Sequence, residues 1–149
     1  MFLGEYKHTI DDKGRVTIPS RYRPLLSEGA YITQGFDRNL MVLRPASFDS
    51  FARKLNQMNI TDARGRQLRR LLLSRAEKVD LDSSGRILIP AFLRETVGIN
   101  AEVVLIGSGY YFEMWSADSW QKQLIELDEA QIDADHFSAL ELFPDEEVA

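Results

Sequence analysis

A five-residue pattern, Asp-x-x-Gly-Arg, occurs twice in the chain, 71 positions apart. It runs from Asp11 to Arg15 and again from Asp82 to Arg86. The same offset, with no gap, places Val-Thr-Ile-Pro of the first half over Ile-Leu-Ile-Pro of the second. This internal repeat limits the possible folds more than any other feature, because whatever unit one copy forms must be formed twice.

Each copy of the motif has the composition of a tight turn. An aspartate at the start of a turn accepts backbone N–H groups two residues on, and a glycine three residues later allows the positive φ that closes a short hairpin loop. We therefore expect two β-hairpins, each with a second strand that begins at the arginine. The expected turn-forming residues are Asp11, Gly14, Asp82 and Gly85.

The strand after the first turn should have two different faces. Period-2 alternation places Val16 and Ile18 on the inner face, and Arg15 and Thr17 on the outer face, with Arg15 at an exposed hairpin tip. Leu88 takes the place of Thr17 in the second copy, so we expect that outer face to be buried. An arginine on a rigid hairpin suits phosphates and base edges. The alternative is structural: each arginine pairs with the aspartate of its own turn.

A short helix is expected after each hairpin. The first would have Ser20 as its N-cap, and Pro24 would limit it to little more than one turn. The second would end at Gly98. The offset of 71 also aligns Arg23 with Arg94.

Each repeat then continues into a second hairpin. The expected strands are 31–34 with 40–43 in the first copy, and 102–106 with 110–114 in the second. A repeat of about forty-five residues is too short to bury a core, since chains below roughly 60 residues are marginal. The two copies should therefore interlock into one barrel-like core of about eight short strands.

Four segments follow from this division of the chain. The expected limits are repeat 1 over 5–47, a helical insert over 48–75, repeat 2 over 76–119 and an acidic tail over 120–149. Apolar residues at helical spacing in the insert predict a helical pair that covers the sheet or contacts another subunit. They include Phe48, Phe51, Leu55 and Met58.

Together these features resemble the MraZ family of bacterial transcription regulators. The resemblance rests on both turn motifs with their hydrophobic-proline continuations, on the opening segment 1–4 and on the Arg/Leu-rich segment 69–73. It implies an α+β fold with a mainly β core: a double-split, swapped-hairpin β-barrel of the SpoVT/AbrB type, formed by the two repeats and flanked by helices. It also implies a ring-like homo-oligomer that binds double-stranded DNA at promoter direct repeats of a division and cell-wall gene cluster.

The resemblance also assigns residues. The family's DNA-contacting arginine carries over to Arg15 and Arg86, and Lys13 adds a basic residue to the first turn. Ser84 stands opposite Lys13 in the second turn, so we do not expect the two hairpins to contribute equally. No cofactor, catalytic activity or small-molecule substrate is expected.

Charge is distributed unevenly along the chain. The net charge is −5, but residues 1–75 carry +7 and residues 76–149 carry −12, and from Leu124 onward there are nine acids and no lysine or arginine. Charges are screened over about 8 Å at physiological salt, so a basic hairpin surface is compatible with a distant acidic tail. We expect a solvated tail; the alternative is a tail that competes with DNA. The arginines within 64–75 predict either a solvated helix face or a surface for phosphates or a second subunit.

Other features exclude several site classes. The chain has no cysteine, which excludes disulfides and thiolate zinc sites, and its two histidines, His8 and His136, do not have metal-ligand spacing. No apolar run approaches 18 residues, and no basic segment followed by an apolar run opens the chain. We therefore expect a cytoplasmic protein without membrane contact, and the resemblance to the MraZ family implies association with the nucleoid.

Two other functions fit part of the pattern. The first alternative is an aspartic protease, in which Asp11 and Asp82 would form a carboxylate pair at a pseudo-twofold axis, as in a dimeric enzyme of that class. In those enzymes the glycine follows the aspartate by two residues, whereas in this chain it follows by three. The second alternative is an antitoxin-like interaction module, because related swapped-hairpin proteins occupy a toxin with an acidic tail. A neighbouring toxin nuclease gene would favour it, whereas a methyltransferase gene followed by division genes would favour the regulator.

Overall fold

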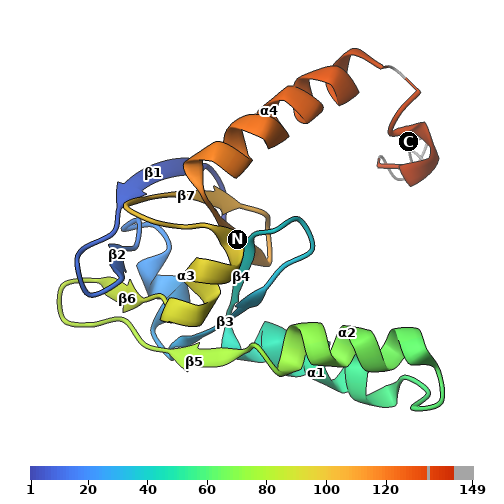
Figure 1. Cartoon of the computed structure of the whole chain (residues 1–149), viewed down its shortest axis with the longest axis horizontal. Helices are drawn as coiled ribbons and strands as arrows, with labels where there is room; N and C mark the ends of the chain where they lie inside the picture. Colours follow the sequence, from blue (N-terminus) through green and yellow to red (C-terminus); the bar gives the residue numbers. More distant parts are fainter. Residues whose placement is uncertain (134, 143–149) are drawn as a thin grey trace, which may run out of the picture. The chain divides into compact units, whose positions relative to one another are not determined.

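A computed structural model describes residues 1–133 and 135–142, and the chain divides into two compact units, Met1–Ala117 and Asp118–Ala149 (Figure 1). The strands of the described part are β1 (Glu5–Thr9), β2 (Arg15–Thr17), β3 (Ala30–Gln34), β4 (Leu40–Leu43), β5 (Glu77–Val79), β6 (Arg86–Leu88), β7 (Glu102–Gly107) and β8 (Tyr111–Trp115). Its helices are the 3-10 helix η1 (Arg23–Leu26), α1 (Pro45–Gln57), α2 (Ala63–Leu73), α3 (Ala91–Val97), α4 (Ala117–Ile132) and the 3-10 helix η2 (Ser138–Leu140). The chain is therefore a mixed α+β protein.

The first strand of each repeat pairs within the other repeat. Six strands form an antiparallel sheet in the order β1-β7-β8-β4-β3-β5, and β2 and β6 form a second sheet of two strands (Figure 1). Thus β1 of the first repeat lies beside β7 of the second, and β5 of the second lies beside β3 of the first. The two repeats interlock as expected. Among the described strands β1 and β5 remain the edges of the sheet, so a closed barrel is not seen.

The turns of the predicted hairpins form, but their strands pair differently. The Gly14 N–H donates to the Asp11 carbonyl and the Asp11 N–H to the Arg15 carbonyl, at 3.0 Å each, and a single bridge joins Ile10 to Val16. The main partner of β2 is β6 of the other repeat rather than β1. The prediction of two independent hairpins was therefore wrong about the partner strand. A local sequence pattern specifies a turn and a strand face, but it does not specify which strand lies alongside.

The hydrophobic core lies beneath the two-stranded sheet. Val16 and Ile18 are 0% exposed, which confirms the predicted inner face of the first repeat, and Ile87 and Ile89 of the second repeat are 0–1% exposed as well. Leu88 is 52% exposed, which contradicts its expected burial. The reason is that Leu88 lies on the face of the ribbon opposite to Ile87 and Ile89, and those two residues enter the core.

The two short helices differ from each other. The first is the 3-10 helix η1, whose N-cap is Tyr22 without a side-chain bond, so the predicted Ser20 cap is wrong. Pro24 lies in its first turn, where the missing N–H costs nothing. The second, α3, ends at Gly98 with φ +71°, as predicted. Tyr22 is almost fully buried, and its ring centroid lies 5.0 Å from that of Phe2.

The helical insert docks on the sheet through its own apolar residues. The Phe48 ring stacks on Tyr31 of β3 at a centroid distance of 4.2 Å, and Leu55 is 2% exposed. The Thr33 hydroxyl donates to the Leu72 carbonyl at 2.6 Å, which ties α2 to the same strand. Most of the predicted apolar stripe is therefore used within the chain; Met58, at the end of α1, is exposed.

Arginines of α2 stabilise the end of α1. Nη1 of Arg69 donates to the Leu55 and Met58 carbonyls at 2.8 and 3.1 Å, and Nη1 of Arg66 donates to the Ile60 carbonyl at 2.9 Å. The last carbonyls of a helix have no partner within the helix, so Arg69 caps α1, while Arg66 holds the loop that follows it. The interpretation of a purely solvated arginine face is therefore incomplete.

The second unit contains α4 and η2. The sequence predicted a solvated acidic tail over 120–149, and in this range the chain is helical to Ile132. The apolar residues Ile132, Leu140 and Leu142 are 73–85% exposed. The last acids, Asp145, Glu146 and Glu147, lie outside the described residues. Across the described residues, none of the helices has the length and apolar character needed to cross a membrane.

Candidate nucleic-acid interface

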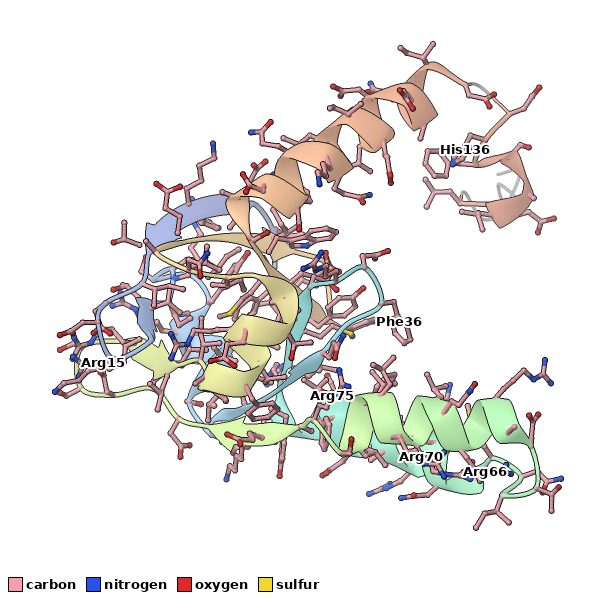
Figure 2. The ribbon with its side chains drawn as sticks, in the orientation of Figure 1. Arg15, Phe36, Arg66, Arg70, Arg75 and His136 are labelled. Carbon is pink, nitrogen blue, oxygen red and sulfur yellow. The ribbon has the colours of Figure 1, made fainter. Side chains whose placement is uncertain are left out.

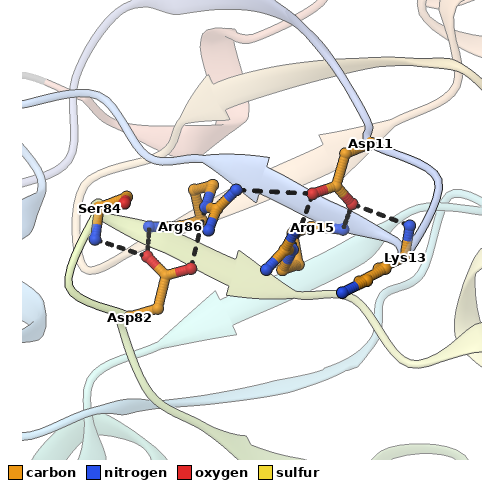
Figure 3. A network of polar contacts seen from close by, with 6 residues as sticks. All are labelled: Asp11, Lys13, Arg15, Asp82, Ser84 and Arg86. Atoms are coloured by element: carbon orange, nitrogen blue, oxygen red, sulfur yellow. Dashed lines mark hydrogen bonds and ion pairs between the residues drawn. The ribbon is translucent and has the colours of Figure 1, made fainter.

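The β2–β6 ribbon, defined as residues 15–17 and 86–88, brings the two repeated arginines onto one face. Its register pairs Arg15 with Leu88, Val16 with Ile87, and Thr17 with Arg86. Since the middle pair points into the core, the other four side chains lie on the outer face. The arginines are therefore diagonal neighbours (Figure 3). The sequence predicted both arginines as DNA-contacting residues, but it did not predict that they lie side by side on one ribbon.

Each arginine is held by the aspartate of its own turn. Asp11 accepts hydrogen bonds from the backbone N–H of Lys13 at 3.0 Å, from that of Arg15 at 2.8 Å, and from Nε of Arg15 at 2.7 Å. Asp82 accepts the equivalent three bonds from Ser84 and Arg86, all at 2.9 Å (Figure 3). The structural alternative, pairing across each turn, is thus observed. Within each turn the aspartate holds the guanidinium group through Nε and not through a terminal nitrogen.

The same bonds keep both carboxyl groups ionised. Donation from the Arg15 backbone N–H is the main cause that lowers the pKa of Asp11, and the Arg86 backbone N–H does the same for Asp82. Two carboxylates that share a proton would instead require one strongly raised pKa. The geometry therefore speaks against the aspartic-protease alternative.

The arginines are less exposed than the sequence suggested. The side chains of Arg15 and Arg86 are 30% and 31% exposed, so Arg15, predicted at an exposed hairpin tip, is partly buried. The Nε of each arginine is bound to the aspartate of its own turn. Lys13, in the first turn, is exposed.

A second pair of arginines covers the glycines of the turns. Gly14 and Gly85 have φ of +85° and +76°, as the turn requires. A Cβ on Gly14 would lie 2.7 Å from Nη2 of Arg94, and one on Gly85 would lie 2.6 Å from Cζ of Arg23. Each arginine comes from the repeat opposite to its glycine, and its Nε donates to a carbonyl of its own repeat. These two residues were not among the predicted site residues, although the offset of 71 already aligned them.

The arginine cluster on α2 is separate from this interface. Figure 2 shows Arg15 on the ribbon, at one end of the first unit, and Arg66 and Arg70 on the helical pair at the other. The candidate interface comprises the cations of the ribbon and its turns: Lys13, Arg15, Arg23, Arg86 and Arg94.

Comparison with known proteins agrees with the duplicated architecture. The family model described as "MraZ protein, putative antitoxin-like" matches the chain twice, over residues 1–71 and 72–146. The chain belongs to the MraZ family. A transcriptional regulator MraZ of Roseiflexus castenholzii is 48% identical over 128 residues, which cover 86% of this chain and 90% of the relative. A transcriptional regulator MraZ of Herpetosiphon aurantiacus is 42% identical over 140 residues, which cover 93% of this chain and 98% of the relative.

Membership of the MraZ family also gives the functional class. The relatives are named transcriptional regulators, and two copies of the family's domain are present. The protein is therefore a transcription regulator. The exact limits of the four segments stay a prediction. They are 5–47 and 76–119 for the repeats, with the insert between them and the tail after them.

Proposed function

We propose that this protein binds specific double-stranded DNA sequences by placing the β2–β6 ribbon in the major groove, with Arg15, Arg86 and Lys13 as contacting residues. One observation carries the proposal: the arginines of both repeats project from the same face of a two-stranded ribbon. The major groove of B-DNA admits such a ribbon. Two independent hairpins would not have provided this surface.

The way in which Arg15 is held suits base recognition. Its Nε is bound to Asp11, and within the described residues its Nη1 and Nη2 make no hydrogen bond to the protein. The two terminal nitrogens form a fork that matches O6 and N7 of guanine. Since the aspartate already fixes the side chain, less rotamer entropy is lost on binding. Arg23 and Arg94, at the two ends of the ribbon, add positive charge where the phosphate backbones would run.

We further propose that the protein acts as a homo-oligomer, ring-like as in the resemblance, on repeated promoter sites of a division and cell-wall gene cluster. One ribbon of six residues covers few base pairs, so useful affinity requires several ribbons on several repeats. In this proposal the interlocked repeats form a swapped-hairpin barrel, and the regulator is found with the nucleoid. Light scattering at micromolar concentration tests the assembly: a monomeric mass would contradict it.

Gel shift with the DNA upstream of the protein's own gene tests the central proposal. The wild type should shift this duplex and not a scrambled one, and Arg15→Ala should abolish specific binding. Arg70→Ala, which removes an exposed arginine from α2, is the matched control and should bind normally. Unchanged affinity of a folded Arg15→Ala protein would refute the proposal.

The antitoxin-like module remains the second candidate, since the family model carries that description and the chain ends in an acidic segment. It predicts that the neighbouring gene encodes a toxin nuclease and that the protein inhibits this nuclease. A gel shift that depends on Arg15 favours the regulator instead, because toxin capture through the tail does not need the ribbon.

A further inference from the structure

The outer face of the ribbon is nearly symmetric, but the residue opposite each arginine differs chemically between the two repeats. The pseudo-twofold relation of the repeats exchanges Arg15 with Arg86, and it also exchanges Leu88 with Thr17. The arginines, their aspartates and the turn glycines are the same in both copies. The residue opposite each arginine is not: leucine faces Arg15, and threonine faces Arg86.

Leu88 is placed where it would touch a base. Residues directly opposite each other in an antiparallel pair have Cβ atoms about 5 Å apart, and successive bases rise by about 3.4 Å along each strand of DNA. If Arg15 reads one base pair, the side chain of Leu88 therefore reaches the same pair or the next. Leu88 is 52% exposed, while its neighbour Ile87 is 1% exposed.

The two side chains recognise different chemistry. A leucine has no hydrogen-bonding group, so the favourable contact it can make in the major groove is with the 5-methyl group of thymine. Against the amino group of cytosine it would bury a donor without a partner, which costs free energy. A threonine carries both a hydroxyl and a methyl group, and it can satisfy more than one base.

We propose that Leu88 is a specificity-determining residue that selects a thymine beside the base read by Arg15, while Thr17 tolerates several bases beside Arg86. This inference rests on the proposed function of the ribbon. Its consequence is that a pseudo-symmetric ribbon reads an asymmetric site, strict at the Leu88 end and permissive at the Thr17 end.

Removal of single methyl groups from DNA tests this directly. Duplexes are first selected from a random pool with the full-length protein, and each thymine of the enriched site is then replaced by deoxyuridine, which removes only the 5-methyl group. One replacement should weaken wild-type binding about fourfold, the equivalent of about 0.8 kcal/mol for a buried group of this size. Leu88→Ala should bind the thymine and deoxyuridine duplexes equally.

Two further variants sharpen the test. Leu3→Ala truncates another exposed leucine, outside the ribbon, and should keep the fourfold preference. Leu88→Thr, which gives both ends a threonine, should yield a selected site without the strict thymine. Leu88 is exposed, so both of its variants should fold, which melting curves would verify.

The outcomes separate this inference from the proposal on which it rests. If Arg15→Ala abolishes binding but Leu88→Ala keeps the thymine preference, only the role of Leu88 is overturned. The same holds if no deoxyuridine replacement weakens the wild type. If no site is enriched, or if Arg15→Ala binds as well as the wild type, both are overturned.

Discussion

Nη1 of Arg86 lies 3.7 Å from Oδ2 of Asp11, an aspartate of the other repeat. Arg86 therefore lies near two carboxylates, its own Asp82 and Asp11, whereas the ion pairs of Arg15 in the described part of the chain involve Asp11 alone. The shared carboxylate couples the two repeats at the centre of the ribbon (Figure 3). It also gives the two arginines different surroundings, although their motifs are the same.

We expect Arg86→Ala to weaken specific DNA binding less than Arg15→Ala, because more of the charge of Arg86 is balanced within the protein. Lys13→Ala should weaken binding to all sequences alike, since a lysine at the turn would meet phosphate. The measurement is affinity as a function of salt concentration for the three variants. Loss of a phosphate contact lowers the slope by about one unit. Equal losses of affinity in all three variants would show that the difference between the two hairpins does not affect DNA binding.

Acid should weaken the ribbon through its aspartates. The pKa of Asp11 and that of Asp82 lie below the ordinary 3.8 in the folded state. The ionised carboxylates therefore favour folding above about pH 4, and this contribution is lost as the pH falls through the lowered pKa values. Asp11→Asn should lower the melting temperature at pH 7, and its difference from the wild type should shrink toward pH 2.

Asp12→Asn is the control for the acid experiment, because it removes a charge from the same turn without a bond to Arg15. It should melt close to the wild type throughout the range. A difference between Asp11→Asn and the wild type that stays constant from pH 7 to pH 2 would contradict the role assigned to the carboxylate.

Two glycine substitutions should have different effects on stability. A Cβ on Gly107 would lie 2.5 Å from backbone atoms of Leu3, so Gly107→Ala must displace the opening segment and should cost about 1–3 kcal/mol. A Cβ on Gly65, in α2, meets only ordinary contacts at 3.5 Å, so Gly65→Ala should be neutral or should stabilise by up to about 1 kcal/mol. Chemical denaturation measures both changes. Similar effects of the two substitutions would show that the opening segment is not packed against β7 in solution.

Truncation after Ala130 should leave the protein folded and should raise its affinity for unrelated duplex DNA, or leave it unchanged. The removed segment contains six acids and no lysine or arginine, and it would repel phosphates. Titration with non-specific duplex at low salt measures the effect, with a melting curve as the test of folding. Weaker binding or loss of the assembly would show that the segment has a structural role instead.

Local features of the fold were readable from the sequence. The Asp-x-x-Gly spacing predicted both turns because an aspartate acceptor and a glycine with positive φ act within five residues. The alternation around Val16 predicted the buried face, and Gly98 predicted the end of α3. The repeat itself predicted the duplicated domain of the MraZ family. Each of these signals depends on residues that are neighbours in the chain.

The pairing of β2 with β6 was decided by the tertiary structure. A strand with one apolar face shows the same alternation whichever strand lies beside it, so the sequence pattern alone suggested two separate hairpins. The cross-repeat contacts of Arg86 with Asp11 and of Arg94 with Gly14, and the exposure of Leu88, all follow from that pairing. Both contacts join residues more than 70 positions apart. Over such a separation the packing of the shared core, rather than local propensity, selects the partner strand.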